Sequence, residues 1–264
     1  MPLVFLKLGG SLITDKTRPY TLRSEKLDAL AAEIAAGLEK NADLQLILGH
    51  GSGSFGHAAA SRYATRLGVT TPEAWRGFAE VWYQASTLNR LVVEALHRVN
   101  LPVVSFSPAA SVIAQDGRVL SWNTSPIQSA LSNGLLPLIQ GDVTFDAIRG
   151  GTILSTEDLF AHLAHQLRPQ RILLAGQESG VWSDFPAREH LLEQITPETI
   201  SQMTPGLGAA AGFDVTGGML SKVTGMLSLV EEIPGLEISI FSGELPGNIF
   251  RALHGENLGT CLHC

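Results

Sequence analysis

The sequence predicts a three-layer α/β/α sandwich, in which a mainly parallel sheet lies between two layers of helices. Short apolar runs alternate with longer amphipathic stretches almost from one end of the 264-residue chain to the other. Strands that are separated by helices favour a parallel sheet covered on both faces. Apolar residues make up 45% of the chain and charged residues 16%, which suits a sizeable core. No linker rich in Pro, Gly or Ser breaks the pattern, so we expect one sheet in one domain over residues 1–264.

Apolar runs bounded by turn residues predict the strands of the sheet. In chain order they cover residues 3–8, 44–48, 103–106, 135–140, 171–175 and 237–241. Two further pieces, residues 142–148 and 152–154, are separated by Arg149-Gly150-Gly151 and favour a hairpin.

Apolar residues at helical spacing predict the helices. Between the first two strands, the residues that share one face of a helix over 22–40 are Leu27, Leu30, Ala31, Ile34 and Leu38. Pro72 opens a long helix to about residue 98, and Pro102 follows its end. The remaining helices are expected at about 124–133, 156–167 and 218–232.

The charge balance argues against a protein that binds nucleic acid. Lys and Arg total 18 against 25 Asp and Glu, a formal charge of −7. Sequence-independent nucleic-acid binding depends instead on neutralising phosphates with basic side chains. A small anionic ligand stays possible, because a few converging groups can hold it whatever the net charge.

The two ends of the chain offer little that points to function. No basic segment before a long apolar stretch opens the sequence, and no run of 18 apolar residues occurs, so we expect a cytoplasmic protein. The two cysteines, Cys261 and Cys264, are too few for a disulfide framework. Their Cys-Leu-His-Cys segment lacks the second pair that a closed zinc site needs, so we expect a frayed tail.

Four glycine-bearing turns are the strongest functional signal. They lie at residues 7–11, 50–57, 140–142 and 214–219, and the last precedes a predicted helix that carries Lys222. Glycine lets the backbone approach a ligand closely, and exposed amides at the start of a helix bind anions. Ligands of open parallel sheets bind beyond the carboxyl ends of the strands. Four such turns, at least two of them with a lysine nearby, indicate a polyphosphate held from several sides.

One of these turns also matches a dinucleotide-binding pattern. Residues 51–56 read G-x-G-x-x-G and follow a predicted strand. The acidic residue about 20 positions further on, Glu73, lies near the start of a helix, whereas the fingerprint requires it at the end of the next strand. His50 and His57 flank the turn, although a pyrophosphate cradle needs neither. The NAD or FAD interpretation is therefore disfavoured, and the Walker A and protein-kinase motifs do not occur.

The order and spacing of the turns resemble the amino acid kinase family and, within it, the isopentenyl phosphate kinases. The most specific segments are Lys7-Leu8-Gly9-Gly10-Ser11-Leu12-Ile13-Thr14 with Lys16, the glycine turn that ends in His57, and Asp214-Val215-Thr216-Gly217-Gly218-Met219 with Lys222. Smaller matches are Gly141-Asp142-Val143, Ser155-Thr156-Glu157-Asp158 and Leu258-Gly259-Thr260. A histidine that ends the glycine turn separates these kinases, and the similar fosfomycin kinases, from relatives that phosphorylate carboxylates.

The resemblance implies a function and a set of site residues. It implies ATP-dependent phosphorylation of isopentenyl phosphate, with Mg²⁺ arriving on ATP, in a homodimer. It divides the chain at about residue 170 into an acceptor-binding lobe, 1–170, and a nucleotide-binding lobe, 171–264. The catalytic side chains would be Lys7, Lys16, His57 and Lys222. The ATP contacts would be Lys7, Gly9, Gly10, Ser11, Gly53, Gly180, Gly218 and Lys222. The acceptor contacts would be Gly51, Ser52, Gly56, His57, Gly141 and Asp142.

The chemistry of phosphoryl transfer agrees with that set. The reaction needs in-line positioning and cations around the spreading negative charge more than it needs covalent chemistry. Donor and acceptor are both phosphates and repel each other, so lysines have to gather around them. Lys16 is the best candidate for stabilising the transferring group, and His57 for donating a hydrogen bond to the acceptor phosphate. A phosphate monoester is already an adequate nucleophile, so no general base is expected.

The sequence departs from the family pattern at three positions. The glycine turn usually reads Gly-Gly-Gly in this family, and here Ser52 replaces the middle glycine. Gln177 and Ser179 stand where acidic residues usually line the nucleotide, which puts the nucleotide contacts in question.

Aromatic residues on the long helix allow two interpretations. Trp75, Phe78 and Trp82 repeat at i, i+3 and i+7, a spacing typical of plain core packing. By resemblance, the same helix borders the pocket for the isoprenoid tail, and an apolar tail needs such a wall. Phe78 and Trp82 are therefore candidate tail-binding residues.

Three alternatives remain beside the resemblance. Lys16 and Lys222 are also typical of solvated surface lysines, and His57 of an ordinary residue at the start of a helix. The acceptor could be fosfomycin or another small phosphonate or phosphate. The altered Gln177 and Ser179 leave open a member of the family that binds nucleotide or oxyanions without catalysis. His162 and His165 lie three apart on a helix, but a third metal ligand is not evident.

Overall fold

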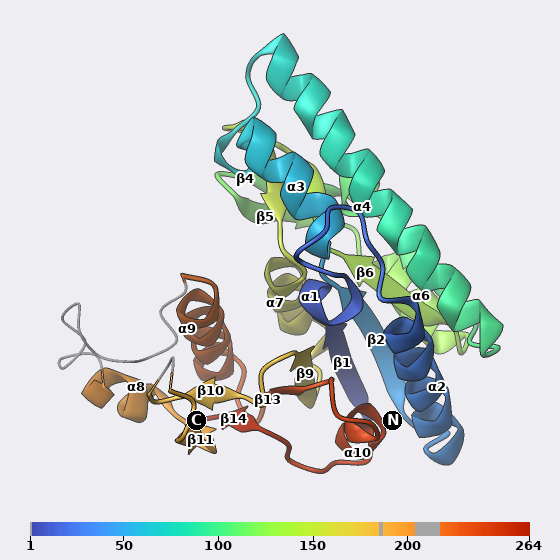
Figure 1. The fold of residues 1–264 in the computed structure, drawn as a ribbon, viewed down its shortest axis with the longest axis vertical. Helices are drawn as coiled ribbons and strands as arrows, with labels where there is room; N and C mark the ends of the chain where they lie inside the picture. The colour runs from blue at the N-terminus through green and yellow to red at the C-terminus, as the bar shows by residue number, and fades with distance from the viewer. Residues whose placement is uncertain (1, 185–186, 204–216) are drawn as a thin grey trace.

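The computed structural model describes residues 2–184, 187–203 and 217–264, without the side chains of residues 57, 201–203, 217 and 218. Its central sheet has eight strands in the order β12-β14-β13-β9-β1-β2-β6-β3 (Figure 1). Neighbours from β13 to β3 pair in parallel, whereas β14 runs antiparallel to β13. The bounds are β1 (Leu3–Leu8), β2 (Gln45–His50), β3 (Val103–Phe106), β6 (Leu136–Gln140), β9 (Arg171–Gly176), β12 (Gln194–Ile195), β13 (Glu237–Ser242) and β14 (Thr260–Leu262).

Helices cover both faces of this sheet, because successive side chains of its strands point to opposite sides. In β1, Leu6 and Leu8 join one apolar cluster with the helices α2 (Ser24–Lys40), α4 (Pro72–Arg98) and α10 (Asn248–Leu253). Phe5, the residue before Leu6, joins the opposite cluster with α6 (Ser125–Ser132), α7 (Thr156–Leu167) and α9 (Gly217–Glu232). The predicted three-layer α/β/α sandwich is confirmed.

A second sheet, of four strands in the order β5-β4-β7-β8, corrects the expectation of a single sheet. Its strands are β4 (Val112–Gln115), β5 (Arg118–Trp122), β7 (Asp142–Asp146) and β8 (Gly150–Leu154). It packs with α3 (Gly53–Tyr63) and the first half of α4 at one end of the molecule (Figure 1). The Asp146 carboxylate ties its two hairpins together by accepting the backbone N–H groups of Asp116, Gly117, Ile148 and Arg149 at 2.8–3.1 Å.

Short elements complete the described chain. They are α1 (Gly10–Ile13), the 3₁₀ turn η1 (Thr65–Leu67), α5 (Pro108–Ser111), α8 (Pro197–Met203) and a two-stranded sheet of β10 (Val181–Trp182) and β11 (Leu191–Leu192). Among the described helices, none combines the length and the apolar character that a membrane-spanning segment requires.

The predicted strands and helices are confirmed, with ends that differ by two residues at most, and so is the hairpin of β7 and β8. The hairpin of β4 and β5 was not predicted, and the expected frayed C-terminal tail is wrong. Instead, β14 carries Cys261 into the central sheet, where its backbone pairs with Ser239 of β13 and Gln194 of β12. Cys261 and Cys264 are free thiols.

The topology directs the functional segments to one edge of the central sheet. Leu8 at the end of β1 pairs with His50 at the end of β2 and with Ala175 in β9. The turns that follow these three strands are therefore neighbours. The chain builds outward from β1 through β2 and then crosses to β9 on its other side, and such a reversal of strand order is where open α/β sheets bind ligands.

Candidate active site

The turns after β1 and β2 touch each other backbone to backbone. A Cβ on Gly10 would lie 2.6 Å from the Cα of Gly53, and a Cβ on Gly51 would lie 2.9 Å from the nitrogen of Gly10. Gly53 also has a φ of +50°, a conformation that other residues adopt at a cost. Glycine is therefore required in both turns, because any side chain would push them apart.

This close approach brings four unused backbone donors together. The amides of Gly9 and Gly51 are taken by the carbonyls of Ala175 and Leu8, at 2.8 and 3.0 Å. The neighbouring amides have no acceptor within the part of the chain that the structure describes. These four amides belong to Gly10, Ser11, Ser52 and Gly53. Unpaired amides at a turn and at the start of a helix form a binding site for an anion such as phosphate.

Two lysines share one carboxylate beside these amides. Lys7 is only 9% exposed, and its ammonium group forms an ion pair with Oε1 of Glu157 in the first turn of α7. Lys222, on α9, places its Nζ 3.9 Å from the same oxygen. Burial acts to raise the pKa of Glu157, but the charges of Lys7 and Lys222 outweigh it and hold that pKa below its usual value. The three side chains together carry one net positive charge, which suits a phosphate ligand.

Glu157 was not predicted as a site residue, although a signal for it exists in the sequence. The capping box of Ser155 and Asp158 fixes the start of α7, where each side chain bonds the backbone N–H of the other. A buried lysine needs a partner of opposite charge, and an acidic residue in the first turn of a helix at the same sheet edge can supply it.

Lys16 lies apart from this ion-pair cluster. It is exposed, in the loop between α1 and α2, and no hydrogen bond or ion pair of its side chain occurs within the described residues. The loop itself is fixed against the start of α3. Thr14 Oγ1 accepts the amide of Ser54 at 2.9 Å, and the ring of Tyr20 packs against that of Phe55. The structure thus places the loop of Lys16 beside the glycine turn, without a contact of the lysine itself.

The predicted acceptor residues follow β2 and β6. Gly141 is wedged against the start of α7, since a Cβ there would lie 3.1 Å from the nitrogen of Thr156. Asp142 is buried and accepts hydrogen bonds from Gln140 Nε2 and from the amide of Val143, at 2.9 and 2.8 Å. Burial raises the pKa of Asp142 to about 7, against the effect of these two donors.

Ser52 fits the turn because residue 56 is glycine. A Cβ on Gly56 would lie 2.5 Å from the Cβ of Ser52, so the serine side chain occupies space that only glycine leaves open. His57 follows in the second turn of α3, and its side chain is outside the described atoms. The glycine at position 56 therefore leaves room for the side chain of Ser52.

The aromatic residues of α4 do not form one continuous wall. Phe78 is 8% exposed and packs in an apolar cluster with Ala59, Val81 and Val143. Its ring lies 5.3 Å from that of Trp75, centre to centre. Trp82 is 45% exposed and has no ring contact within the described residues. The structure therefore groups Phe78 with Trp75 and leaves Trp82 at the surface.

The segments that are predicted to contact the nucleotide lie after β9 and around β14. Gly180 is packed tightly, since a Cβ there would lie 2.5 Å from Thr260 Oγ1. Gly218 lies at the start of α9, and the preceding residues 214–216 are outside the described residues. Ser179 lies in the turn before β10. Of the predicted fourth turn, the structure thus describes residues 217–219, which begin α9, and Lys222 follows them on the same helix.

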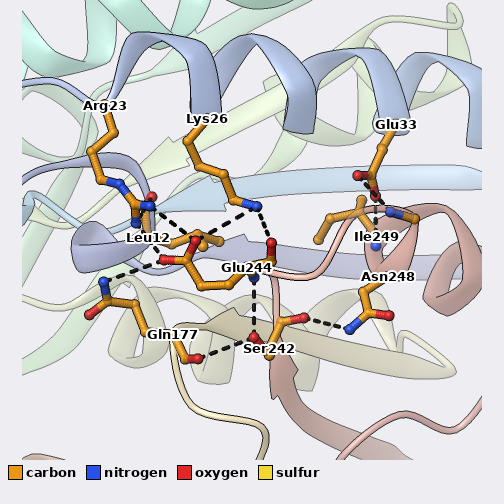
Figure 2. A network of polar contacts seen from close by, with 10 residues as sticks. Leu12, Arg23, Lys26, Glu33, Gln177, Ser242, Glu244, Asn248 and Ile249 are labelled. Atoms are coloured by element: carbon orange, nitrogen blue, oxygen red, sulfur yellow. Dashed lines mark hydrogen bonds and ion pairs between the residues drawn. The ribbon is translucent and has the colours of Figure 1, made fainter.

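Gln177 belongs to a polar network centred on Glu244 (Figure 2). The guanidinium of Arg23, at the start of α2, donates to both carboxylate oxygens of Glu244. Gln177 Nε2 lies 3.4 Å from Oε1 of the same carboxylate, and its carbonyl accepts the hydroxyl of Ser242 at 3.1 Å. An acidic side chain at position 177 would face Glu244 and repel it. The network therefore gives a physical reason for a neutral residue there.

Free amides at two glycine turns, with lysines beside them at the end of a parallel sheet, suit a protein that binds phosphate groups. The model of the amino acid kinase family matches residues 2–242, and the chain belongs to this family. Isopentenyl phosphate kinases of Methanocaldococcus jannaschii and Methanothermobacter thermautotrophicus are each 32% identical to it, and the alignments cover 97–98% of this chain and 97% of theirs. A solved isopentenyl phosphate kinase structure superposes with a TM-score of 0.82 at 31% identity, over 98% of this chain and 99% of its own.

We predict that His50 and Asp142 contribute opposite pH dependences to stability. Burial, together with the charge of Lys7, lowers the pKa of His50 to about 4, so below about pH 6.5 the unfolded chain binds a proton there that the folded chain does not. That contribution makes stability rise with pH. Asp142 keeps its proton in the folded chain up to about pH 7 and loses it in the unfolded chain near pH 4, so its contribution falls with pH.

The test is the free energy of unfolding from urea titrations between about pH 4.5 and 6.5. Relative to the unsubstituted protein, Asp142→Asn should gain stability with rising pH, by up to about 1.4 kcal/mol per pH unit. Relative to the same reference, the free energy of unfolding of His50→Asn should fall with rising pH, by up to about 1.4 kcal/mol per pH unit. Two variants whose curves both run parallel to that of the unsubstituted protein would contradict the prediction.

Proposed function

We propose that the protein transfers the γ-phosphoryl group of ATP to isopentenyl phosphate, giving isopentenyl diphosphate and ADP. The observation that carries this proposal is the convergence of four free amides with the Lys7–Glu157–Lys222 cluster at the carboxyl ends of β1 and β2. The family supports ATP as the donor, and the relatives that match over nearly the whole chain are named isopentenyl phosphate kinases.

The step is an in-line displacement between two phosphates. An oxygen of the acceptor phosphate forms a bond to the γ-phosphorus while the bond to the β–γ bridging oxygen breaks, and ADP takes that oxygen and its electron pair. Amides of Gly10, Ser11 and Gly53 hold phosphate oxygens. Lys7 and Lys222 neutralise the donor, and Glu157 keeps their ammonium groups in place.

Lys16 and His57 complete the proposed site. The loop of Lys16 rests on the start of α3, so a turn of this long side chain would bring its charge to the transferring group. His57, one helical turn beyond Gly53, would donate to the acceptor phosphate next to the amide of Ser52. Gly141 and Asp142 close the acceptor side.

Mg²⁺ is proposed to bind as part of Mg-ATP. Around the two turns, the described residues supply amides and lysines, and Glu157 is already engaged by two cations. A group of three potential ligands, Asp184, Glu189 and His190, lies in the turn between β10 and β11 instead. The oxygens of ATP would therefore be the main ligands of the metal, whose charge would offset that of the phosphates.

An acceptor-binding lobe, residues 1–170, and a nucleotide-binding lobe, residues 171–264, are part of the same proposal. The residues offered to the acceptor, His57, Phe78 and Asp142, precede residue 170, whereas Gly180 and Lys222 follow it. The homodimer stays a prediction from the resemblance, and the cytoplasmic location stays a prediction from the sequence.

The reaction is tested by ADP release from Mg-ATP with isopentenyl phosphate, beside fosfomycin and a blank without acceptor. We expect turnover with isopentenyl phosphate above both, and a loss of about 100-fold or more in kcat for Lys16→Ala and for His57→Ala. Lys40→Ala, an exposed lysine in the last turn of α2, is the matched control and should stay within about twofold. Turnover with fosfomycin alone, or with no acceptor at all, would contradict the proposal.

Phe78 and Trp82 are proposed to border the isoprenoid tail. The apolar cluster of Phe78 includes Ala59, two residues after His57, and Val143, next to Asp142. We predict that Phe78→Ala and Trp82→Ala raise the KM for isopentenyl phosphate about tenfold and leave the KM for ATP within about twofold.

Leu88→Ala, a buried residue of the same helix, is the control for a loss of packing alone. It should lower stability by about 2–4 kcal/mol without a change in the ratio of the two KM values. The tail proposal is wrong if Phe78→Ala and Trp82→Ala behave like this control.

A further inference from the structure

We propose that His50 is a positioning residue for the acceptor turn, the name used here for Gly51, Ser52 and Gly53 after β2. Its ring holds the carbonyl of Gly51 and so directs the amide of Ser52 toward the ligand. The inference rests on the proposed function only for the identity of that ligand, an organic phosphate. His50 itself is buried, at 1% exposure, behind the turn. It therefore acts through the backbone and not by touching a substrate.

The hydrogen bonds of the ring determine where its proton sits. Nδ1 lies 3.1 Å from the carbonyl oxygen of Gly51, which can only accept, so Nδ1 carries the proton and donates. Nε2 is then an acceptor and receives the side-chain amide of Asn89 at 3.1 Å. The oxygen of Asn89 accepts the hydroxyl of Ser105 at 2.9 Å, which holds the asparagine in that orientation. Each residue in the series Ser105, Asn89, His50 and Gly51 thus donates a hydrogen bond to the next one.

The same contacts keep the ring from acting as an acid or base. Burial and the nearby charge of Lys7 lower the pKa of His50 to about 4, so the ring is neutral at physiological pH. A proton on Nε2 would also point at the amide of Asn89, which is itself a donor. His50 is therefore a fixed donor rather than a group that exchanges protons with a ligand.

The orientation of one peptide plane follows from that donor. In a trans peptide the C=O and the N–H of the next residue point in opposite directions. The carbonyl of Gly51 points at the buried ring, so the amide of Ser52 points away from it. That amide has no acceptor among the described residues. With the plane turned over, a carbonyl oxygen would face the phosphate and repel it.

Gly51 needs such a clamp because it is a glycine. Its lack of a side chain permits the close approach to Gly10, but it also leaves the backbone free to rotate. The carbonyl of His50 adds a second anchor, since it accepts Thr156 Oγ1 at 2.7 Å and the amide of Gly141 at 3.2 Å. His50 thus connects the acceptor turn to α4 through Asn89 and to α7 through Thr156.

Two substitutions separate positioning from packing. His50→Leu fills a similar volume without a donor, whereas His50→Asn keeps an N–H donor close to the position of Nδ1. We expect His50→Leu to raise the KM for isopentenyl phosphate at least tenfold and to lower kcat, with the KM for ATP within about twofold. His50→Asn should stay within about threefold of the unsubstituted protein, although both variants lose the contact with Asn89. Equal kinetics for the two variants, or a loss of stability alone, would overturn the proposal.

Two further measurements keep the test decisive. Nitrogen NMR of the unsubstituted protein should show the Nδ1–H tautomer of His50 from pH 5 to 8, and an Nε2–H tautomer or an imidazolium would overturn the inference even if the variants do not fold. Calorimetry with inorganic pyrophosphate should show weaker binding to His50→Leu than to His50→Asn. The two variants can show this difference in pyrophosphate affinity even if the unsubstituted protein does not turn over isopentenyl phosphate. In that case the proposed function fails and the role of His50 stands.

Discussion

The contact between two glycine turns is the constraint on which the rest of the site depends. Gly10 and Gly51 meet without room for a side chain, so β1 and β2 can end side by side and direct free amides to one place. A glycine backbone is also conformationally free, so hydrogen bonds from other residues, here called clamps, have to fix it. The clamps are the carbonyl of Ala175 on the amide of Gly9, the hydroxyl of Thr14 on the amide of Ser54, and the ring of His50 on the carbonyl of Gly51.

Charge is balanced around the same contact. Lys7 lies in a buried position, where an unpaired ammonium group would be costly. Glu157 offsets that cost, and the same carboxylate faces Lys222 from α9. The capping box of α7 keeps Glu157 in place. Two lysines far apart in the sequence are thus held together by one carboxylate.

Local patterns in the sequence account for what could be predicted. The long helix α4 starts at Pro72 after the cap Thr71 and ends before Pro102, so its bounds could be predicted closely. Strands β4 and β14 were missed because each has only three or four residues, and each pairs with a segment far along the chain, β4 with β7 and β14 with β12 and β13. In the site, the glycine turns follow recognisable strands, and Lys7 ends one of them. Glu157 and Asn89 become partners of Lys7 and His50 only when α7 and α4 pack on the sheet, which spacing alone does not reveal.

The proposed site requires the two glycine turns to hold phosphates through the amides of Gly10, Ser11, Ser52 and Gly53. These four amide signals can be followed by ¹H–¹⁵N NMR while Mg-ADP and isopentenyl phosphate are added together. We expect all four protons to move downfield as they form hydrogen bonds to phosphate oxygens, while the amide of Gly235, in the turn before β13, stays in place. Saturable binding that leaves the four signals unmoved would contradict phosphate binding by these turns.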